Sequence, residues 1–249
     1  MLQYFLSENL KIKNTFLKKM VWIMPILTVL LSFFLAANYF QVDSYNWWYT
    51  LMLPGSVSLT CTLQSKIDGS MKNRAVLSLP VDLKKIWVAK VFVGIKNLSI
   101  SCLIIFLSVQ LSSLVINRQA IGEMPFLNSL LATILLIVTF MWQIPLCMFL
   151  GNKIGVFSTV LINVPLNIIF TILSVEKYWW AIPFSYPARL MCPVLKILPN
   201  GLLAKPGSQT FTPELLNYSS IPFGVSISII LLLAITYFTA RWFEKQEVI

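Results

Sequence analysis

The sequence contains no histidine and few charged residues, and both features narrow its function. Without histidine, the chain cannot form a Ser-His-Asp triad, a histidine metal site or the usual histidine pH switch. Charged residues make up 11% of the chain and hydrophobic residues 57%, whereas a soluble domain carries about 25% charged residues. A soluble fold of 249 residues could not hide that much apolar surface, because surface-to-volume scaling limits burial. A bilayer removes the difficulty, so the composition predicts an integral membrane protein.

Acidic residues are especially scarce, with 9 Asp and Glu against 19 Lys and Arg. We place all of them in loops or tails, which argues against an intramembrane aspartyl or metal protease and against an acidic proton relay. The nucleotide-binding pattern G-x-x-x-x-G-K-[ST] does not occur, since the GNKIG segment at 151–155 has the wrong spacing. We therefore expect no catalytic activity, no metal and no cofactor bound by this chain.

The four cysteines form no C-x-x-C pair. Cys61, Cys102 and Cys147 fall inside apolar runs, where a thiol behaves as a small hydrophobe. Cys192 falls outside these runs, so we expect no intramolecular disulfide.

Long apolar runs divide the chain into membrane spans. We predict an all-α membrane protein with six transmembrane helices, at about residues 21–40, 47–65, 91–116, 125–150, 154–175 and 221–240. Pro54 and Gly55 predict a kink in the second span. The Gly-Asn-Lys sequence at 151–153 predicts a tight turn between the fourth and fifth spans. A segment rich in proline and aromatic residues, at 176–220, lies on the outer side before the last span.

Residues 1–19 precede the first span and carry an imperfect apolar stripe. Leu2, Leu6 and Leu10 share one helical face, and Lys11 and Lys18 lie opposite. We predict a helix in the cytoplasmic membrane interface, with its lysines at the lipid headgroups. The alternative is an irregular cytoplasmic tail. A secretory signal peptide is disfavoured, because the following apolar stretch is too long and more spans follow.

The net charge of +10 can be interpreted in two ways. On a soluble protein it would suggest nucleic acid, whereas on a membrane protein it suggests loops that obey the positive-inside rule. The hydropathy favours the second reading, so we expect no nucleic-acid partner. Six spans place both termini on one side, together with most Lys and Arg; the exceptions are Arg118, Lys177, Arg189, Lys196 and Lys205. We therefore expect both termini in the cytoplasm.

This layout, with a long inner loop at 66–90, resembles the ABC-2 class of ABC-exporter permeases. The loop contains LSLPVD at 77–82, and in that class a similar segment lies between the second and third spans, near the ATPase. The outer segments WWAIPFSYP at 179–187 and ILPNG at 197–201 resemble the lantibiotic-immunity permeases of the MutE/EpiE type. No large outer domain follows the first span, which fits that group.

The resemblance implies a complex in the bacterial plasma membrane. An ABC ATPase subunit, present as two copies, would bind ATP and Mg, and a second related permease would pair with this chain. The substrate would be a cationic lantibiotic-type peptide. The transporter would take this peptide from the membrane and release it outside, which gives self-protection or resistance.

The inner loop is the best functional candidate, because a permease without its own ATPase needs a stiff cytoplasmic element that senses the partner. Gly69 and Pro80 delimit a segment of helix length. The coupling candidates are Lys66, Asp68, Gly69, Lys72, Arg74, Leu79, Pro80 and Asp82. The alternative is a solvated loop that only obeys the positive-inside rule.

Two further groups of residues are candidates. Residues proposed to contact substrate or membrane lipid on the outer side are Trp179, Trp180, Tyr186, Arg189, Pro199, Asn200 and Gly201. We expect a short interfacial helix that Pro187 opens and Gly201 ends; as an alternative, the tryptophans are ordinary interfacial anchors. Polar residues at membrane depth are Gln143, Asn163 and Asn167. Such amides usually hydrogen-bond between helices, and a polar transport path is the alternative.

Three classes of function remain. The first is an exporter permease for a lantibiotic or another amphipathic substrate. The second is a membrane scaffold or sensor that binds partners without moving a substrate, and copurification of an ATPase would distinguish the first from it. The third, a membrane-embedded enzyme, is disfavoured because ionisable groups are missing from the spans.

Overall fold

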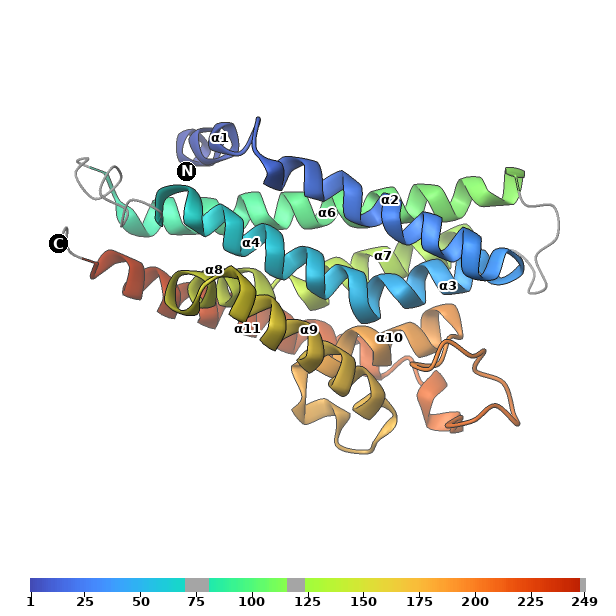
Figure 1. Ribbon diagram of the computed structural model, residues 1–249. Coiled ribbons are helices and arrows are strands. Elements are labelled where there is room, and N and C mark those ends of the chain that lie inside the picture. The colour runs from blue at the N-terminus through green and yellow to red at the C-terminus, as the bar shows by residue number, and fades with distance from the viewer. Residues whose placement is uncertain (70–80, 116–123, 247–249) are drawn as a thin grey trace.

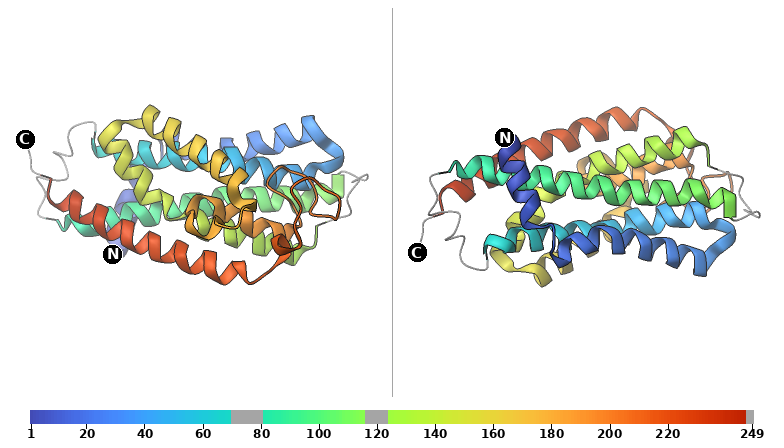
Figure 2. Two further views of the ribbon diagram at one scale, coloured as in Figure 1. Left: turned by 90° about the horizontal axis from the view of Figure 1, so that it is seen from below. Right: turned by 90° about the horizontal axis from the view of Figure 1, so that it is seen from above.

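A computed structural model describes residues 1–69, 81–115 and 124–246, which are almost entirely helical. Its long helices run side by side along one axis (Figure 1). The N-terminal helix α1 (Leu2–Lys11) and the last turn of α11 (Ser220–Glu244) lie at the same end of this bundle in every view (Figures 1 and 2). We call it the terminal end and the opposite one the distal end.

The remaining helices complete the bundle. They are α2 (Phe16–Ala36), α3 (Phe40–Trp47), α4 (Leu53–Gly69), α6 (Leu83–Val115), α7 (Phe126–Phe140), α8 (Gln143–Ile154), α9 (Val156–Ile172) and α10 (Tyr186–Leu195). Short 3-10 turns cover Ala37–Tyr39, Leu173–Val175, Trp179–Ala181, Pro183–Ser185 and Pro213–Leu216, and a π-helical turn covers Trp48–Met52. Within the described ranges β-pairing is limited to an isolated antiparallel bridge between Ile197 and Leu203.

Five helical stretches in the described residues are long and apolar enough to cross a membrane. The first, Phe16–Asp68, has 53 residues and would measure about 80 Å if straight, far more than the about 30 Å hydrocarbon layer. It folds back on itself at the 3-10 turn Ala37–Tyr39, so that α2 packs along α3 and α4. The predicted all-helical membrane class is thus confirmed.

The outside of the bundle is unusually apolar compared with the surface of a soluble protein. Large apolar side chains point outward, and Phe34 and Phe157 are 79% and 76% exposed. The interior holds a large apolar core and, within it, polar side chains such as Ser58, Gln143 and Asn163. This distribution is stable only where hydrocarbon surrounds the helices and polar groups find their partners inside.

Two prolines account for the irregular helix geometry. Pro54 has no amide hydrogen for the carbonyl of Thr50, and the π-helical turn Trp48–Met52 directly precedes it. A kink was predicted at Pro54 and Gly55; the structure places a π-helical turn just before them. Pro145 likewise cannot donate to Met141, and the predicted fourth span is divided there into α7 and α8.

The turn predicted at 151–153 was wrong, because these residues belong to α8. The chain instead reverses at Gly155, whose φ of 88° suits glycine. Gly151 serves packing: a Cβ there would lie 2.7 Å from Cγ2 of Thr62 and 3.0 Å from its Cα. The absence of a side chain thus allows α8 to approach α4 closely.

Helix ends at the terminal end differ from their predicted positions. The helix expected over residues 1–19 ends at Lys11, and α2 begins at Phe16. α4 continues to Gly69 and α6 begins at Leu83, so much of the expected loop at 66–90 is helical. Within that loop, residues 70–80 lie outside the described part of the chain.

The segment at 176–220 is not purely a surface segment. It folds back as α10, all ten residues of which are buried against neighbours that include α7. Cys192, expected outside the apolar runs, is buried in this helix. The helix ends at Leu195, followed by Lys196 in the left-handed conformation (φ 57°), and not at Gly201 as predicted.

A glycine-to-alanine pair tests the close approach of α4 and α8. Gly151→Ala should lower the free energy of unfolding by about 1–3 kcal/mol, because its Cβ meets backbone-anchored atoms of Thr62. Gly55→Ala is the matched control within α4: its Cβ would lie 3.8 Å from the nearest atom, an ordinary contact. Thermal unfolding in detergent should therefore separate the two variants, and equal melting temperatures would contradict the packing role of Gly151.

Candidate functional site

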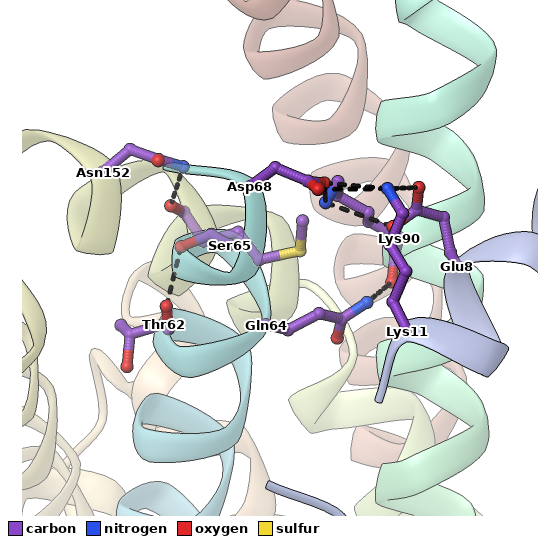
Figure 3. Close-up of polar contacts among 9 residues, drawn as sticks. Glu8, Lys11, Thr62, Gln64, Ser65, Asp68, Lys90 and Asn152 are labelled. Carbon is purple, nitrogen blue, oxygen red and sulfur yellow. Dashed lines mark hydrogen bonds and ion pairs between the residues drawn. The ribbon is translucent and has the colours of Figure 1, made fainter. Parts of the chain in front are cut away.

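Four charged side chains meet in an ion cluster at the terminal end of the bundle (Figure 3). Nζ of Lys90 lies 2.5 Å from Oδ2 of Asp68 and 3.1 Å from Oε2 of Glu8. Nζ of Lys11 lies 2.7 Å from Oε1 of Glu8 and 3.0 Å from Oδ2 of Asp68. Each ammonium group therefore contacts both carboxylates, and the charges cancel.

The ion cluster is largely removed from water. The Lys90 side chain is 2% exposed, and those of Glu8 and Asp68 are 5% and 9% exposed. Only Lys11, at 29%, retains substantial contact with solvent. Removing one member of such a buried group costs about 3–5 kcal/mol, because the remaining charges lose their compensation.

Three helices supply the ion cluster. Glu8 and Lys11 are one turn apart on α1, Asp68 is in the last turn of α4, and Lys90 is in the first turns of α6. Nε2 of Gln64 donates to the backbone carbonyl of Lys90 at 2.9 Å, which adds a second link between α4 and α6 (Figure 3). The ion cluster thus ties α1 to the two helices that flank residues 70–80.

Further contacts hold α1 across α6. Nζ of Lys96 donates to Oδ1 of Asn9 and lies 6.0 Å from the ring centre of Phe5. Beyond the end of α1, Ile12 packs with Val93 in a small buried apolar group. Leu2, Leu6 and Leu10 are exposed, while Glu8 on the same helix is buried. α1 therefore turns its leucines to the outside of the bundle and its charges toward the bundle.

Lys11 keeps its charge over a wide pH range. Burial lowers the pKa of Lys11, but the hydrogen bonds and ion pairs to Glu8 and Asp68 outweigh this effect and raise the pKa above its usual 10.5. Because the folded-state pKa is raised, the stability that Lys11 contributes is present at neutral pH and is lost only as the pH rises through the raised value.

The predicted coupling residues do not all meet in one place. Asp68 belongs to the ion cluster, and Gly69 is the last residue of α4. Lys66 is exposed on α4 and faces the turn at Gly155. Four others lie outside the described residues: Lys72, Arg74, Leu79 and Pro80.

Asp82 has a local structural role at the start of α6. Its Oδ1 accepts a hydrogen bond from the backbone amide of Lys85 at 3.1 Å, and its Oδ2 lies 3.1 Å from Nζ of Lys85. This is the geometry of a helix N-cap. The backbone hydrogen bond, followed by the side-chain contact, lowers the pKa of Asp82 below its usual 3.8.

Three members of the ion cluster were not predicted as site residues. Lys11 was expected at the lipid headgroups, Lys90 at the end of the inner loop at 66–90, and Glu8 in no site. Asp68 was expected in a loop, whereas it lies in the last turn of α4. The scarcity of acidic residues was the available signal, since each carboxylate near a span requires a partner. Which lysine meets which carboxylate depends on how three helices pack, and no local pattern reports this.

The three predicted intramembrane amides come together in an amide cluster between α4, α8 and α9. Oε1 of Gln143 accepts from Nδ2 of Asn163 at 3.0 Å and from Nδ2 of Asn167 at 3.2 Å. Nε2 of Gln143 donates to Oδ1 of Asn167 at 3.1 Å, and Asn163 also donates to Oγ of Ser58 at 2.8 Å. All four side chains are buried, so the amides link helices, as such groups usually do.

The predicted outer residues form a packed group at the start of α10. The ring of Trp179 lies edge-on to Tyr186 and Phe223, with ring centres 5.8 Å apart in both pairs. The guanidinium of Arg189 stacks on Trp179 at 5.2 Å. Trp180 differs from Trp179, because its side chain is 57% exposed while its carbonyl accepts a hydrogen bond from Tyr186 Oη.

Arg189 was expected to meet lipid phosphates, but its side chain is buried. Its two terminal nitrogens donate to the backbone carbonyls of Ser174 and Glu214, each at 3.3 Å. Arg189 therefore ties the segments on either side of α10 together.

The last three predicted outer residues lie in the loop after α10. Oδ1 of Asn200 accepts from the backbone amide of Leu202. Gly201 has a φ of 82°, and a Cβ there would lie 2.8 Å from Nδ2 of Asn46. Pro199 precedes them and is partly buried. Asn200 and Gly201 thus shape a turn packed close to α3.

The described part of the chain contains no group of three or more His, Cys, Asp and Glu side chains that could hold a metal ion. Comparisons with known proteins add no identity: no protein-family model matches the sequence, and no curated protein or solved structure matches it significantly.

A charge-balance cycle tests the ion cluster. Lys90→Met should cost about 3–5 kcal/mol, because two buried carboxylates then share only Lys11. Adding Asp68→Asn restores the balance between Glu8 and Lys11, so the double variant should be more stable than Lys90→Met alone. Thermal unfolding in detergent measures both. The control is Lys13→Met, which removes the same charge at an exposed position; if it costs as much as Lys90→Met, the ion cluster contributes nothing specific.

The N-cap of α6 gives a second prediction. Asp82→Ala should cost about 1 kcal/mol, while Asp82→Asn should retain most of the stability, because asparagine also accepts the capping hydrogen bond. Since the pKa of Asp82 is lowered, its stabilising contribution is present above the usual pKa and is lost as the pH falls through the lowered value. Unfolding at pH 7 and pH 3 measures this loss, and equal destabilisation by alanine and asparagine would rule out the cap.

Proposed function

We propose that this chain is a permease subunit of an ATP-driven ABC-2 exporter in the bacterial plasma membrane. Its substrate is a lantibiotic-type peptide, which is removed from the membrane and released outside. The chain does not hydrolyse ATP; a partner ATPase, present as two copies, binds ATP and Mg, and a second related permease completes the pore. The resemblance of the segments at 77–82, 179–187 and 197–201 motivates this assignment.

The arrangement of the helices is compatible with six crossings. Counting both arms of the folded stretch Phe16–Asp68, together with the four other candidate stretches, yields six. An even number of crossings fits the position of α1 and the end of α11 at one end of the bundle (Figure 1). The positive-inside rule then orients this terminal end toward the cytoplasm.

The ion cluster is the observation that carries the coupling role. Asp68 and Lys90 lie on the two helices that flank residues 70–80, where we propose that the ATPase binds. A force on this segment reaches both residues directly. Because each also pairs with α1, the movement passes to the interfacial helix and to the membrane surface.

A hollow beside the ion cluster offers a docking place for the ATPase. It has a volume of about 350 Å³ and lies between α1 and the start of α6. Its lining residues are Gln3, Tyr4, Ser7, Glu8, Lys11, Val81 and Ile86. A protruding side chain of the partner would fit there, in contact with two members of the ion cluster.

At the distal end, the exposed ring of Trp180 is the best candidate for substrate contact. Trp179 is less suited to this role, because its ring already packs against Tyr186, Phe223 and Arg189. Trp180 presents an amphipathic ring that can bind an amphipathic peptide at the outer leaflet.

A survival assay tests the proposed function. Cells carry this chain with the ATPase and permease encoded beside it, and tolerance to a lantibiotic is compared with and without this chain. Reversing charge at the coupling segment, with Lys66→Glu, Lys72→Glu and Arg74→Glu, should abolish peptide-stimulated ATP hydrolysis while membrane insertion remains. Trp180→Ala should lower tolerance without lowering the melting temperature.

Lys205→Glu is the matched control, since it reverses an exposed charge in the loop that follows α10. It should leave peptide-stimulated hydrolysis intact. If an ATPase copurifies with the chain but the chain does not change the tolerance of the cells to the peptide, a scaffold or sensor function would be favoured. Unchanged stimulation in the triple variant would remove the coupling role.

A further inference from the structure

An apolar groove runs between α6 and α11 at the terminal end and has a volume of about 440 Å³. The two helices are antiparallel, so Lys84 and Arg241 lie at its mouth, and Ile95 and Leu232 lie at its inner end. The remaining lining residues are Val88, Val91, Phe92, Leu233, Thr236, Tyr237 and Ala240.

The length of the groove matches one lipid leaflet. From Lys84 to Ile95 the helix rises about 16 Å, close to half of the about 30 Å hydrocarbon thickness. The walls along this length are almost wholly apolar, and Phe92 and Leu233 are exposed at its edges. An extended acyl chain is the shape that fills such a groove.

The mouth of the groove is basic. The guanidinium of Arg241 stacks on Tyr237 at 5.4 Å and forms no ion pair within the described ranges. Lys84 lies 2.9 Å from Glu244, and both side chains are about half exposed. Arg241 therefore presents an uncompensated positive charge, which a phosphate group can neutralise with two parallel hydrogen bonds.

A polar group lies at the depth expected for a lipid ester. Thr236 lines the groove, and its Oγ1 is buried and has no hydrogen-bond partner in the described part of the chain. Thr236 precedes Arg241 by little more than one helical turn, so its hydroxyl lies below the mouth. From the mouth inward, the groove thus offers a cation, a hydroxyl donor and apolar walls.

We propose that this groove binds one anionic phospholipid. Its phosphate contacts Arg241 and Lys84, an ester carbonyl accepts a hydrogen bond from Thr236, and an acyl chain lies between α6 and α11. An apolar helix of a protein partner fits less well, because it would bury Arg241 without neutralising it. That the lipid comes from the inner leaflet rests on the cytoplasmic orientation of the terminal end proposed above. The binding itself does not depend on that orientation.

Native mass spectrometry of the full chain released from nanodiscs tests this proposal. The nanodiscs contain equal amounts of phosphatidylglycerol and phosphatidylcholine. The chain should retain one phosphatidylglycerol, and the double variant Lys84→Gln/Arg241→Gln should lower this occupancy by roughly tenfold, the loss expected when charge-assisted hydrogen bonds are removed. Leu233→Trp keeps both charges but fills the groove, so it should lower the occupancy as well.

Lys245→Gln is the matched control, because it removes a charge beside Arg241 but outside the groove. It should leave the retained phosphatidylglycerol unchanged. Equal retention of phosphatidylcholine, or an equal loss in Lys245→Gln, would overturn the proposal in favour of general attraction to the membrane surface. The proposal would also be overturned if Leu233→Trp abolished a protein dimer and left the bound lipid unchanged, since the groove would then be a protein interface.

Discussion

The fold depends on one constraint: a polar side chain that is buried away from water is costly unless it finds a partner inside the protein. The amide cluster around Gln143 and the ion cluster around Lys90 are two solutions at different depths. Trp87 and Tyr45 meet the same constraint, because the indole donates to Oγ1 of Thr239 and the phenol bonds to Ser129 and Thr133. Because exposed apolar surface costs little in lipid, polar contacts and close packing, as at Gly151, specify how these helices pair.

The terminal end combines three features that bear on the proposed function. The ion cluster holds α1 across the bundle, the hollow between α1 and α6 lies beside it, and the basic groove lies between α6 and α11. α6 contributes to all three, through Lys90, Ile86 and Lys84. A movement of the start of α6 would therefore reach the hollow, α1 and the groove.

Composition and hydropathy were sufficient to predict the all-helical membrane class and the amides at membrane depth, because both are local properties of the sequence. They were not sufficient to predict the role of Gly151, which looks like a turn residue in the sequence. Its packing role becomes visible only when the structure places Thr62 beside it. α10 was misjudged for a related reason: its prolines and Arg189 are typical of an interfacial helix. Its burial depends on α7 and on carbonyl partners at Ser174 and Glu214, distant in sequence.

Cysteine labelling on intact cells measures the central claim, a membrane bundle whose terminal end faces the cytoplasm. The four native cysteines are buried, which keeps the background low. With a membrane-impermeant maleimide, Gln209→Cys should react on intact cells, whereas Lys13→Cys and Lys245→Cys should react only after permeabilisation; all three positions are exposed to solvent or lipid headgroups. Labelling of Lys13→Cys and Lys245→Cys from opposite sides, or of all three in a soluble fraction, would contradict the account.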